Sequence, residues 1–238
     1  MAIPEHHSLV GIPPGGVPLA LARLHRATPV GAEVVIDPPA RFGPAERWRD
    51  VVVGGGFVPC RGRSRRVARA RTLPDTVGPA MRVLVCGLNP SLVAADAGYG
   101  YAGPSNRFWP AALTAALVSR RGDPDHTLLA DGVGMTDLVK RATPSAGVLT
   151  VDEYRDGAAR VERLVRWLRP GAVLFVGLSG WRAVIDRAAV AGWQPSGFAG
   201  APAYVMPSTS GLNAHASRAA LVEHMVAAQQ GPVRGPVA

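Results

Sequence analysis

The amino-acid sequence predicts an α/β protein in which helices cover both faces of a mainly parallel sheet. From about residue 73 onward, short apolar runs typical of buried strands alternate with segments that have the spacing of amphipathic helices. Parallel strands need long crossovers, usually helices, and the resulting sheet is covered on both faces. The chain has 238 residues, 47% of them apolar, which is enough for one domain of ordinary size with extensions.

The first regular elements lie between residues 81 and 139. The run "MRVLVCGL" at 81–88 is almost wholly apolar and predicts a buried strand. The segment "FWPAALTAALVSR" at 108–120 has helical spacing, and its Pro110 is tolerated because it falls in the first turn. The segment "TLLADGVGMTDLV" at 127–139 predicts a short helix followed by a strand-like or loop segment.

The clearest helix signal starts at Thr150. Thr150 and Glu153 have the spacing of a capping box, an apolar face follows, and Pro170 comes after the last turn. The rest of the chain predicts five elements in order: a strand at 172–178, a helix that ends at Gly192, a strand at 203–207, a loop at 208–214 and a helix at 217–230.

The first 72 residues predict a basic, Pro- and Gly-rich extension that is poorly folded or accessory. Turn signals such as "GIPPGG" and "DPPARFGP" interrupt it, and short strands could form at 33–37 and at "VVV", 51–53. The run "RGRSRRVARAR" at 61–71 carries six arginines and would be either a DNA-contacting arm or a solvated linker. We therefore expect an extension at 1–72, one domain at 73–230 and a frayed tail at 231–238.

The charge of the chain favours a nucleic-acid partner. Lys and Arg outnumber Asp and Glu by 26 − 17 = 9, and the calculated pI is about 10.8. A strongly basic domain is typical of nucleic-acid binders, although a general bias toward arginine would also raise the charge.

Composition also limits which cellular compartment and which cofactors are compatible with the sequence. No apolar run reaches the roughly 18 residues of a membrane span, and the N-terminus lacks the pattern of a signal peptide. Cys60 and Cys86 are the only cysteines, too few for a four-cysteine zinc or iron–sulfur site, and we expect Cys86 to be a small core residue. A reducing cytoplasm fits best, with no cofactor and no metal.

Two polar loops should lie close together. "GLNPS" opens a loop of about twenty residues after the strand at 81–88, and "PSTSGLNA" follows the strand at 203–207. Connections in α/β units are usually shorter, and ligand sites in open α/β sheets lie at the carboxyl ends of strands. The sequence therefore predicts a binding site between these two loops.

The two loops and their surroundings resemble the mismatch-specific uracil-/thymine-DNA glycosylase family. The resemblance rests on "GLNPSLVAADAGYGYAGPSNRFW" and "MPSTSGLNA", in order and at matching spacing, and on the lead-in "RTLPDTVGPAMRVLVCGLNP". It covers roughly residues 71–229. The resemblance implies a three-layer α/β/α fold of the uracil-DNA glycosylase type. It also implies hydrolysis of the N-glycosidic bond of a damaged base in double-stranded DNA, with no metal.

The chemistry that the resemblance implies can be compared with the residue types present. An enzyme that acts on a base flips it out of the stack, and the bond breaks through an oxocarbenium-like sugar. Asn89 is the candidate that positions water; alternatively, it only caps the turn before Pro90. Main-chain groups of Gly87, Leu88 and Ser91 could hold the base and its developing charge.

The resemblance also assigns aromatic and amide side chains in the first loop. Tyr101 would stack on the flipped base, or it would simply pack under the loop. Asn106 would line the pocket or hydrogen-bond the long loop into shape. Asp137, in "TDLVKR", aligns with a family position that points at the flipped base, where relatives often carry Asn or Lys; alternatively it is a surface or capping carboxylate.

The second loop supplies the expected DNA contacts. Its hydroxyl residues and Gly211 suit a close approach to phosphates, which carries no sequence information. Leu212 takes the position of the family's wedge, which fills the space of an extruded nucleotide; a core leucine is the alternative. Asn213 and Ala214 replace a Ser-Arg-type pair of the family, so one basic contact is absent. The predicted DNA-contacting residues are Ser208, Thr209, Ser210, Gly211, Leu212 and Asn213.

The sequence thus predicts a monomeric, metal-independent, monofunctional DNA glycosylase. It is predicted to be monofunctional because neither motif has a lysine nucleophile, which a Schiff-base lyase would need. The alternative is a catalytically silent module that binds DNA or a nucleotide on the same fold.

Overall fold

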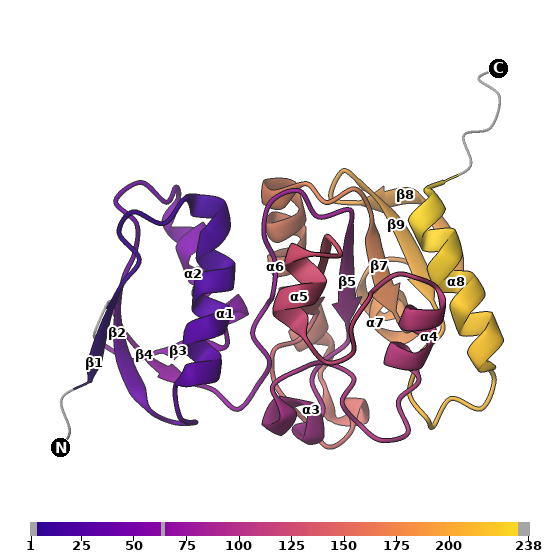
Figure 1. The fold of residues 1–238 in the computed structure, drawn as a ribbon, viewed down its shortest axis with the longest axis horizontal. Helices are drawn as coiled ribbons and strands as arrows, with labels where there is room; N and C mark the ends of the chain where they lie inside the picture. The colour runs from indigo at the N-terminus through magenta and orange to yellow at the C-terminus, as the bar shows by residue number, and fades with distance from the viewer. Residues whose placement is uncertain (1–3, 63–64, 233–238) are drawn as a thin grey trace.

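The structure is a computed structural model, and it describes residues 4–62 and 65–232. Two sheets lie side by side (Figure 1), a four-stranded one near the N-terminus and a five-stranded one that the rest of the chain builds. We call residues 4–72 of this description the N-terminal unit. Among the described residues, no helix is long and apolar enough to cross a membrane.

The N-terminal unit has its own small core, so the prediction that it is poorly folded is wrong. Its sheet has the order β1-β2-β4-β3, with β1 parallel to β2 and the other pairs antiparallel. Leu21, Ile36 and Phe57 are fully buried between the sheet and its helices. The elements are β1 (Glu5–Ser8), η1 (Pro14–Gly16), α1 (Val17–Ala27), β2 (Glu33–Asp37), α2 (Ala45–Gly54), β3 (Phe57–Pro59) and β4 (Arg66–Arg69).

Sequence reasoning placed one of the two short strands in this unit correctly. "EVVID" at 33–37 is β2, as predicted. "VVV" at 51–53 is the end of α2 instead, because Val51 and Val52 face the core on one side of a helix that also carries polar residues. A run of three β-branched residues is too short to show whether its period is that of a strand or a helix.

The described part of the arginine run at 61–71 is built into the N-terminal sheet, and whether it contacts DNA stays a prediction. Part of it forms β4, which lies inside the sheet between β2 and β3. Arg65 bonds Asp37 at 2.8 Å and Arg66 bonds Glu33 at 3.0 Å, so carboxylates of β2 neutralise them. Arg63 lies outside the described residues.

The larger sheet has the order β6-β5-β7-β9-β8 and is parallel except for β8. The strands predicted at 81–88, 172–178 and 203–207 are confirmed, and the uncertain segment at 133–137 is a strand as well. Sequence reasoning missed β8, an edge strand whose Gly and Pro residues hide a strand pattern. The strands are β5 (Val83–Gly87), β6 (Val133–Asp137), β7 (Val173–Val176), β8 (Gly192–Phe198) and β9 (Ala201–Met206).

Helices cover both faces of this sheet, so the chain has the predicted three-layer α/β/α fold. On one face α6 and α7 pack on Leu84, Val173 and other inward side chains, and on the other α4 and α8 pack on Val85, Leu174 and their neighbours. Alternate strand residues therefore enter opposite cores, as the period of a strand requires. The helices are α3 (Leu92–Ala97), α4 (Phe108–Thr114), α5 (Pro124–Leu129), η2 (Ala146–Val148), α6 (Val151–Leu168), α7 (Leu178–Val184) and α8 (Arg218–Gln230).

The ends of the helices agree only partly with the sequence. The capping box of Thr150 and Glu153 is present at the start of α6. Gly192, predicted as a helix C-cap, instead begins β8, and α7 stops at Val184. The frayed tail predicted for 231–238 falls almost wholly outside the described residues.

Candidate active site

The parallel strands of the larger sheet end at one edge, where two loops form a cleft of about 610 Å³. The loop at 88–107 follows β5, and the loop at 207–217 follows β9. All the predicted site residues except Asn213 line the cleft: Gly87, Leu88, Asn89, Ser91, Tyr101, Asn106, Asp137, Ser208, Thr209, Ser210, Gly211 and Leu212. The structure thus brings the residues together, and their roles stay predictions.

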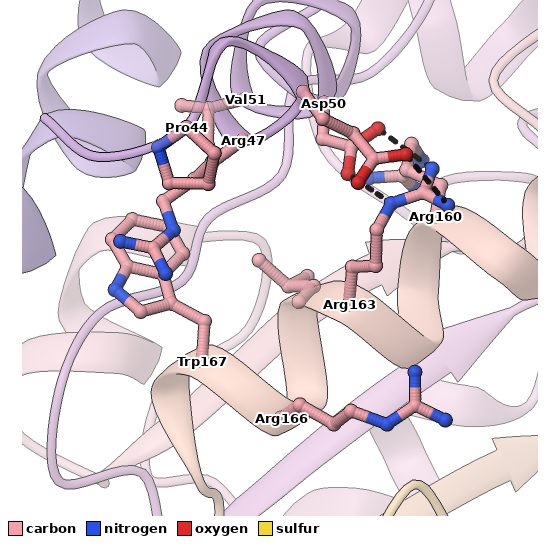
Figure 2. Close-up of a pocket in the computed structure, with 10 residues that line it drawn as sticks. Pro44, Arg47, Asp50, Val51, Arg160, Arg163, Arg166 and Trp167 are labelled. Carbon is pink, nitrogen blue, oxygen red and sulfur yellow. Dashed lines mark hydrogen bonds and ion pairs between the residues drawn. The ribbon is translucent and has the colours of Figure 1, made fainter.

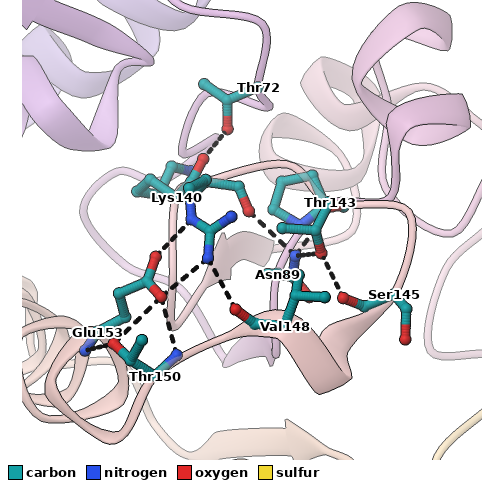
Figure 3. Close-up of polar contacts among 10 residues, drawn as sticks. Thr72, Asn89, Lys140, Thr143, Ser145, Val148, Thr150 and Glu153 are labelled. Atoms are coloured by element: carbon teal, nitrogen blue, oxygen red, sulfur yellow. Dashed lines mark hydrogen bonds and ion pairs between the residues drawn. The ribbon is translucent and has the colours of Figure 1, made fainter.

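The Asn89 side chain is held in one orientation. Its Nδ2 donates to Thr143 Oγ1 at 2.8 Å, to the Arg141 carbonyl at 3.0 Å and to the Pro90 carbonyl at 3.1 Å. Two of these acceptors are carbonyls, which cannot donate, so the amide nitrogen must face them. Figure 3 shows Thr143 beside Asn89, with Ser145 accepting from Thr143 behind it.

The consequence is that Asn89 Oδ1 is left for another partner. No described residue hydrogen-bonds this oxygen, and Asn89 lines the cleft. An amide oxygen fixed in this way can accept a hydrogen bond from a water and set its direction. The same three contacts tie the loop after β5 to the segment after β6, so Asn89 has a structural role here and its catalytic role stays a prediction.

The shape of the first loop depends on Trp109, Asn106 and Arg107. Trp109 Nε1 bonds the Gly100 carbonyl at 2.9 Å, and Asn106 Oδ1 accepts from the Phe108 amide at 3.0 Å. Asn106 therefore shapes the loop as well as lining the cleft. Arg107 bonds the carbonyls of Ser210 and Asn213 in the second loop. Sequence reasoning missed Arg107, although it stands in the "NRFW" run that carried the resemblance.

Tyr101 stands at the inner wall of the cleft. One face of its ring is stacked on Phe108, with ring centres 4.0 Å apart and planes 13° apart. Its backbone has φ of 60°, a conformation that L residues rarely adopt and that often occurs at functional sites. Its hydroxyl is buried and has no partner among the described residues. Burial, Asp137 and Cys86 raise the pKa of this phenol, which therefore stays neutral.

Asp137 lies at the end of β6, directly beside Gly87 of β5. A Cβ on Gly87 would collide with the Asp137 carboxylate and touch the Tyr101 hydroxyl, so both polar groups gather where this glycine leaves room. Burial raises the pKa of Asp137 to about 6; Asp75 also raises it, while Lys140 and Arg160 oppose the rise. Asp137 is partly buried and lines the cleft, and its role there stays a prediction.

The second loop presents one apolar tip. Leu212 has 96% of its surface exposed, so it is not a core leucine. Gly211 lies so close to Ser105 that a Cβ would need both loops to move apart. Asn213 does not line the cleft, because its Nδ2 closes the loop on the Ser208 carbonyl at 2.8 Å.

Two of the expected phosphate contacts from this loop need correction. Thr209 is 1% exposed, so its hydroxyl is not available to a phosphate. Asn213 uses its amide within the loop. Ser208 and Ser210 are partly exposed at the cleft and keep the predicted role as possible contacts.

A second cavity, of about 260 Å³, lies between the N-terminal unit and α6. Figure 2 shows Arg47 beside Trp167 on one side of this cavity and Arg163 beside Asp50 on the other. The Arg47 guanidinium lies over the Trp167 ring, 5.0 Å from its centre. Arg163 is already held by Asp50 through two hydrogen bonds of 2.6 and 2.9 Å. This cavity contains none of the predicted site residues and lies between α2 and α6.

The two remaining predictions concern Cys86 and metal ligands. Cys86 is buried in β5, as predicted, and burial raises the pKa of its thiol. No group of three or more His, Cys, Asp or Glu side chains among residues 4–62 and 65–232 is arranged to hold a metal ion.

Fold and cleft together define a class of protein. It is an α/β/α protein with a polar cleft at the carboxyl edge of its sheet, an asparagine fixed for hydrogen bonding, and an exposed leucine at the rim. The family model for the uracil DNA glycosylase superfamily matches residues 74–229, and the chain belongs to that superfamily.

One solved structure can be compared with the chain. It is a solution NMR structure of a candidate uracil DNA glycosylase from Methanosarcina acetivorans. The two chains are 18% identical, the match covers 67% of this chain and 96% of that one, and the TM-score is 0.46.

Proposed function

We propose that the protein is a monofunctional DNA glycosylase of the mismatch-specific uracil-/thymine type, which removes uracil or a related damaged or mismatched base from duplex DNA. The observation that carries the proposal is the fixed amide of Asn89, which lines the cleft and whose Oδ1 accepts no hydrogen bond from a described residue. Membership of the superfamily supports the reaction class. We also propose that the glycosylase domain begins near residue 72, that the protein is a monomer, and that it acts on DNA in the cytoplasm.

In the mechanism, Asn89 Oδ1 accepts a hydrogen bond from the water that attacks the sugar. An amide is a poor base, so Asn89 orients the water while the glycosidic bond breaks to an oxocarbenium-like sugar. Main-chain N–H groups around Leu88 and Ser91 are proposed to stabilise the negative charge on the departing base; Pro90 has no N–H to give. The free face of Tyr101 is proposed as the stacking surface for the flipped base.

The monofunctional assignment has support from the lysine content. Lys140 is the only lysine in the chain, so 25 of the 26 Lys and Arg residues are arginines. Its Nζ bonds the buried Asp75 carboxylate at 2.9 Å, and Lys140 does not line the cleft. A lyase that forms a Schiff base needs a free amine at the sugar, and this lysine does not provide one.

The direct test is incubation with duplex oligonucleotides that carry G:U, G:T, A:U, inosine or an etheno adduct, followed by alkaline cleavage of the abasic site. Strand breaks on at least one lesion support the glycosylase. Tight duplex binding without breaks on any of them would favour the alternative, a silent DNA- or nucleotide-binding module.

We expect Leu212→Ala to slow excision from A:U pairs by about 10-fold and from G:U mismatches much less. Extruding a base from a stable pair costs more than extruding a mismatched one, so a wedge matters more for A:U. Single-turnover rates on the two duplexes measure the effect. Equal losses on both would show that Leu212 is not a wedge.

We propose that Asp137 works in its ionised form and accepts a hydrogen bond from N3–H of uracil. Cytosine has an acceptor at N3, so the carboxylate would disfavour it. Because burial raises the pKa of Asp137 to about 6, uracil removal should fall as the pH drops through about 6. Asp137→Asn should abolish this dependence, since an amide accepts but does not ionise. Activity that instead falls as the pH rises would show that the protonated form is active.

A further inference from the structure

Three charged side chains are buried together next to the cleft, and we call them the charge cluster: Asp75, Lys140 and Arg160. Asp75 is 4% exposed and Arg160 is 5% exposed. The Asp75 carboxylate accepts from Arg160 Nη1 at 2.5 Å and from Lys140 Nζ at 2.9 Å. Burial alone would raise the pKa of Asp75, but the two cations hold it below its usual value, so the cluster is ionised. The cleft described above uses none of these side chains as lining.

Arg160 joins the charge cluster to the end of β6. Its Nη2 donates to the Asp137 carbonyl at 2.7 Å and to Thr136 Oγ1 at 3.2 Å. Thr136 in turn donates to Asp75 at 2.7 Å. The last two residues of β6 are therefore held from α6, and the Asp137 side chain leaves the strand at the cleft.

A glycine in α6 brings Arg160 to this position. Gly157 lies one turn before Arg160, and a Cβ there would collide with the Leu138 carbonyl. Glycine in the middle of a helix costs about 1 kcal/mol relative to alanine, so its use here is explained by the close approach of α6 to the chain after β6.

The N-terminal unit closes over the charge cluster. The Asp75 amide bonds the Gly54 carbonyl at the end of α2, at 2.7 Å. A Cβ on Gly54 would collide with the Asp75 carboxylate and would lie 3.0 Å from Arg160 Nη1. The backbone at the end of α2 therefore forms one wall around the buried ions.

We propose that the charge cluster positions Asp137 in the cleft and sets the charge that Asp137 presents to a flipped base, and that the N-terminal unit completes it. The proposal rests on the proposed function of the cleft. Every titratable or charged group that faces Asp137 comes from a different segment: Cys86 of β5, Tyr101 of the first loop, Asp75 before β5, Lys140 after β6 and Arg160 of α6. Among the described groups that face Asp137, only Lys140 and Arg160 of the charge cluster are cations.

Two substitutions separate the two effects of the cluster. Lys140→Met removes a cation and leaves the contact of Arg160 with Asp137, so the pH midpoint of uracil removal should rise by about one unit. Arg160→Lys keeps a cation but loses that contact, so the rate should fall about 10-fold with little change in midpoint. Arg155→Gln is the matched control, because Arg155 lies on α6, as Arg160 does, but its positive charge is exposed.

The measurements are single-turnover rates on G:U duplexes from pH 5 to 8, with thermal unfolding to verify that each variant is folded. A midpoint in Lys140→Met equal to that of Arg155→Gln would overturn the proposal, as would an unchanged rate in Arg160→Lys. A merely structural cluster would lower stability without moving the midpoint. If the unaltered protein cleaves none of the lesion duplexes, the proposed function is wrong. Carboxyl-carbon NMR titration of Asp137 in the same variants then decides the inference, and an unmoved pKa overturns it.

Discussion

Replacing Asn89 with alanine should reduce base excision by about 10²- to 10⁴-fold while duplex binding stays near that of the unaltered protein. The side chain has no described contact that would bind DNA, but it is the fixed acceptor for water in the proposed mechanism. Loss of water orientation slows bond hydrolysis and leaves phosphate contacts in place. Single-turnover cleavage and equilibrium binding on the same G:U duplex measure the two effects separately.

Asn89→Asp is the sharper companion variant. It keeps the size of the side chain, but it places a carboxylate oxygen against the carbonyls of Pro90 and Arg141, which cannot donate to it. We expect excision to fall about as far as in Asn89→Ala. Thr143→Val is the control, since it removes only one of the three acceptors of Nδ2 and should lose far less activity. Near-normal single-turnover rates in both Asn89 variants would remove Asn89 from the mechanism.

The largest loss of stability should come from Asp75→Asn. Among the described residues, Asp75 is the only carboxylate that bonds the buried Lys140 and Arg160, so the variant leaves two cations uncompensated. Breaking a buried ion pair by removing one partner typically costs about 3–5 kcal/mol. Urea unfolding, followed by fluorescence or circular dichroism, should show this decrease in the free energy of unfolding.

Asp96→Asn is the matched control for Asp75→Asn. Asp96 bonds Arg71 at 2.6 Å, but both side chains are about half exposed, and exposed ion pairs contribute little. This variant should unfold at nearly the same urea concentration as the unaltered protein. If Asp75→Asn behaved in the same way, the buried cations would have another source of compensation, and the description of the charge cluster would be incorrect.

The sequence predicted those parts of the fold whose signals are local. Short apolar runs marked β5, β7 and β9, and the capping box marked the start of α6. The two polar loops were predicted to meet because parallel strands end at one edge, and the structure places both at the cleft. The resemblance to the glycosylase family then indicated which residues of these loops belong to the predicted site.

The parts that the sequence did not predict depend on contacts between distant segments. Gly and Pro residues hid the strand pattern of β8. The arginine run was expected to be exposed because its carboxylate partners lie about thirty residues away in the chain, on β2. Asp75, Lys140 and Arg160 are also far apart in the chain, and nothing local marks them as partners. The single lysine of the chain was the available signal, since a lone lysine among 25 arginines stands out in the composition.

The position of Gly54 also bears on how such chains can be divided during evolution. The superfamily match begins at residue 74, one residue before Asp75, yet the wall over Asp75 is the end of α2 in the preceding unit. The segment that matches the superfamily therefore does not contain all the residues that enclose the charge cluster. A relative that lacked α2 would have to cover these ions with another segment or replace them with apolar residues.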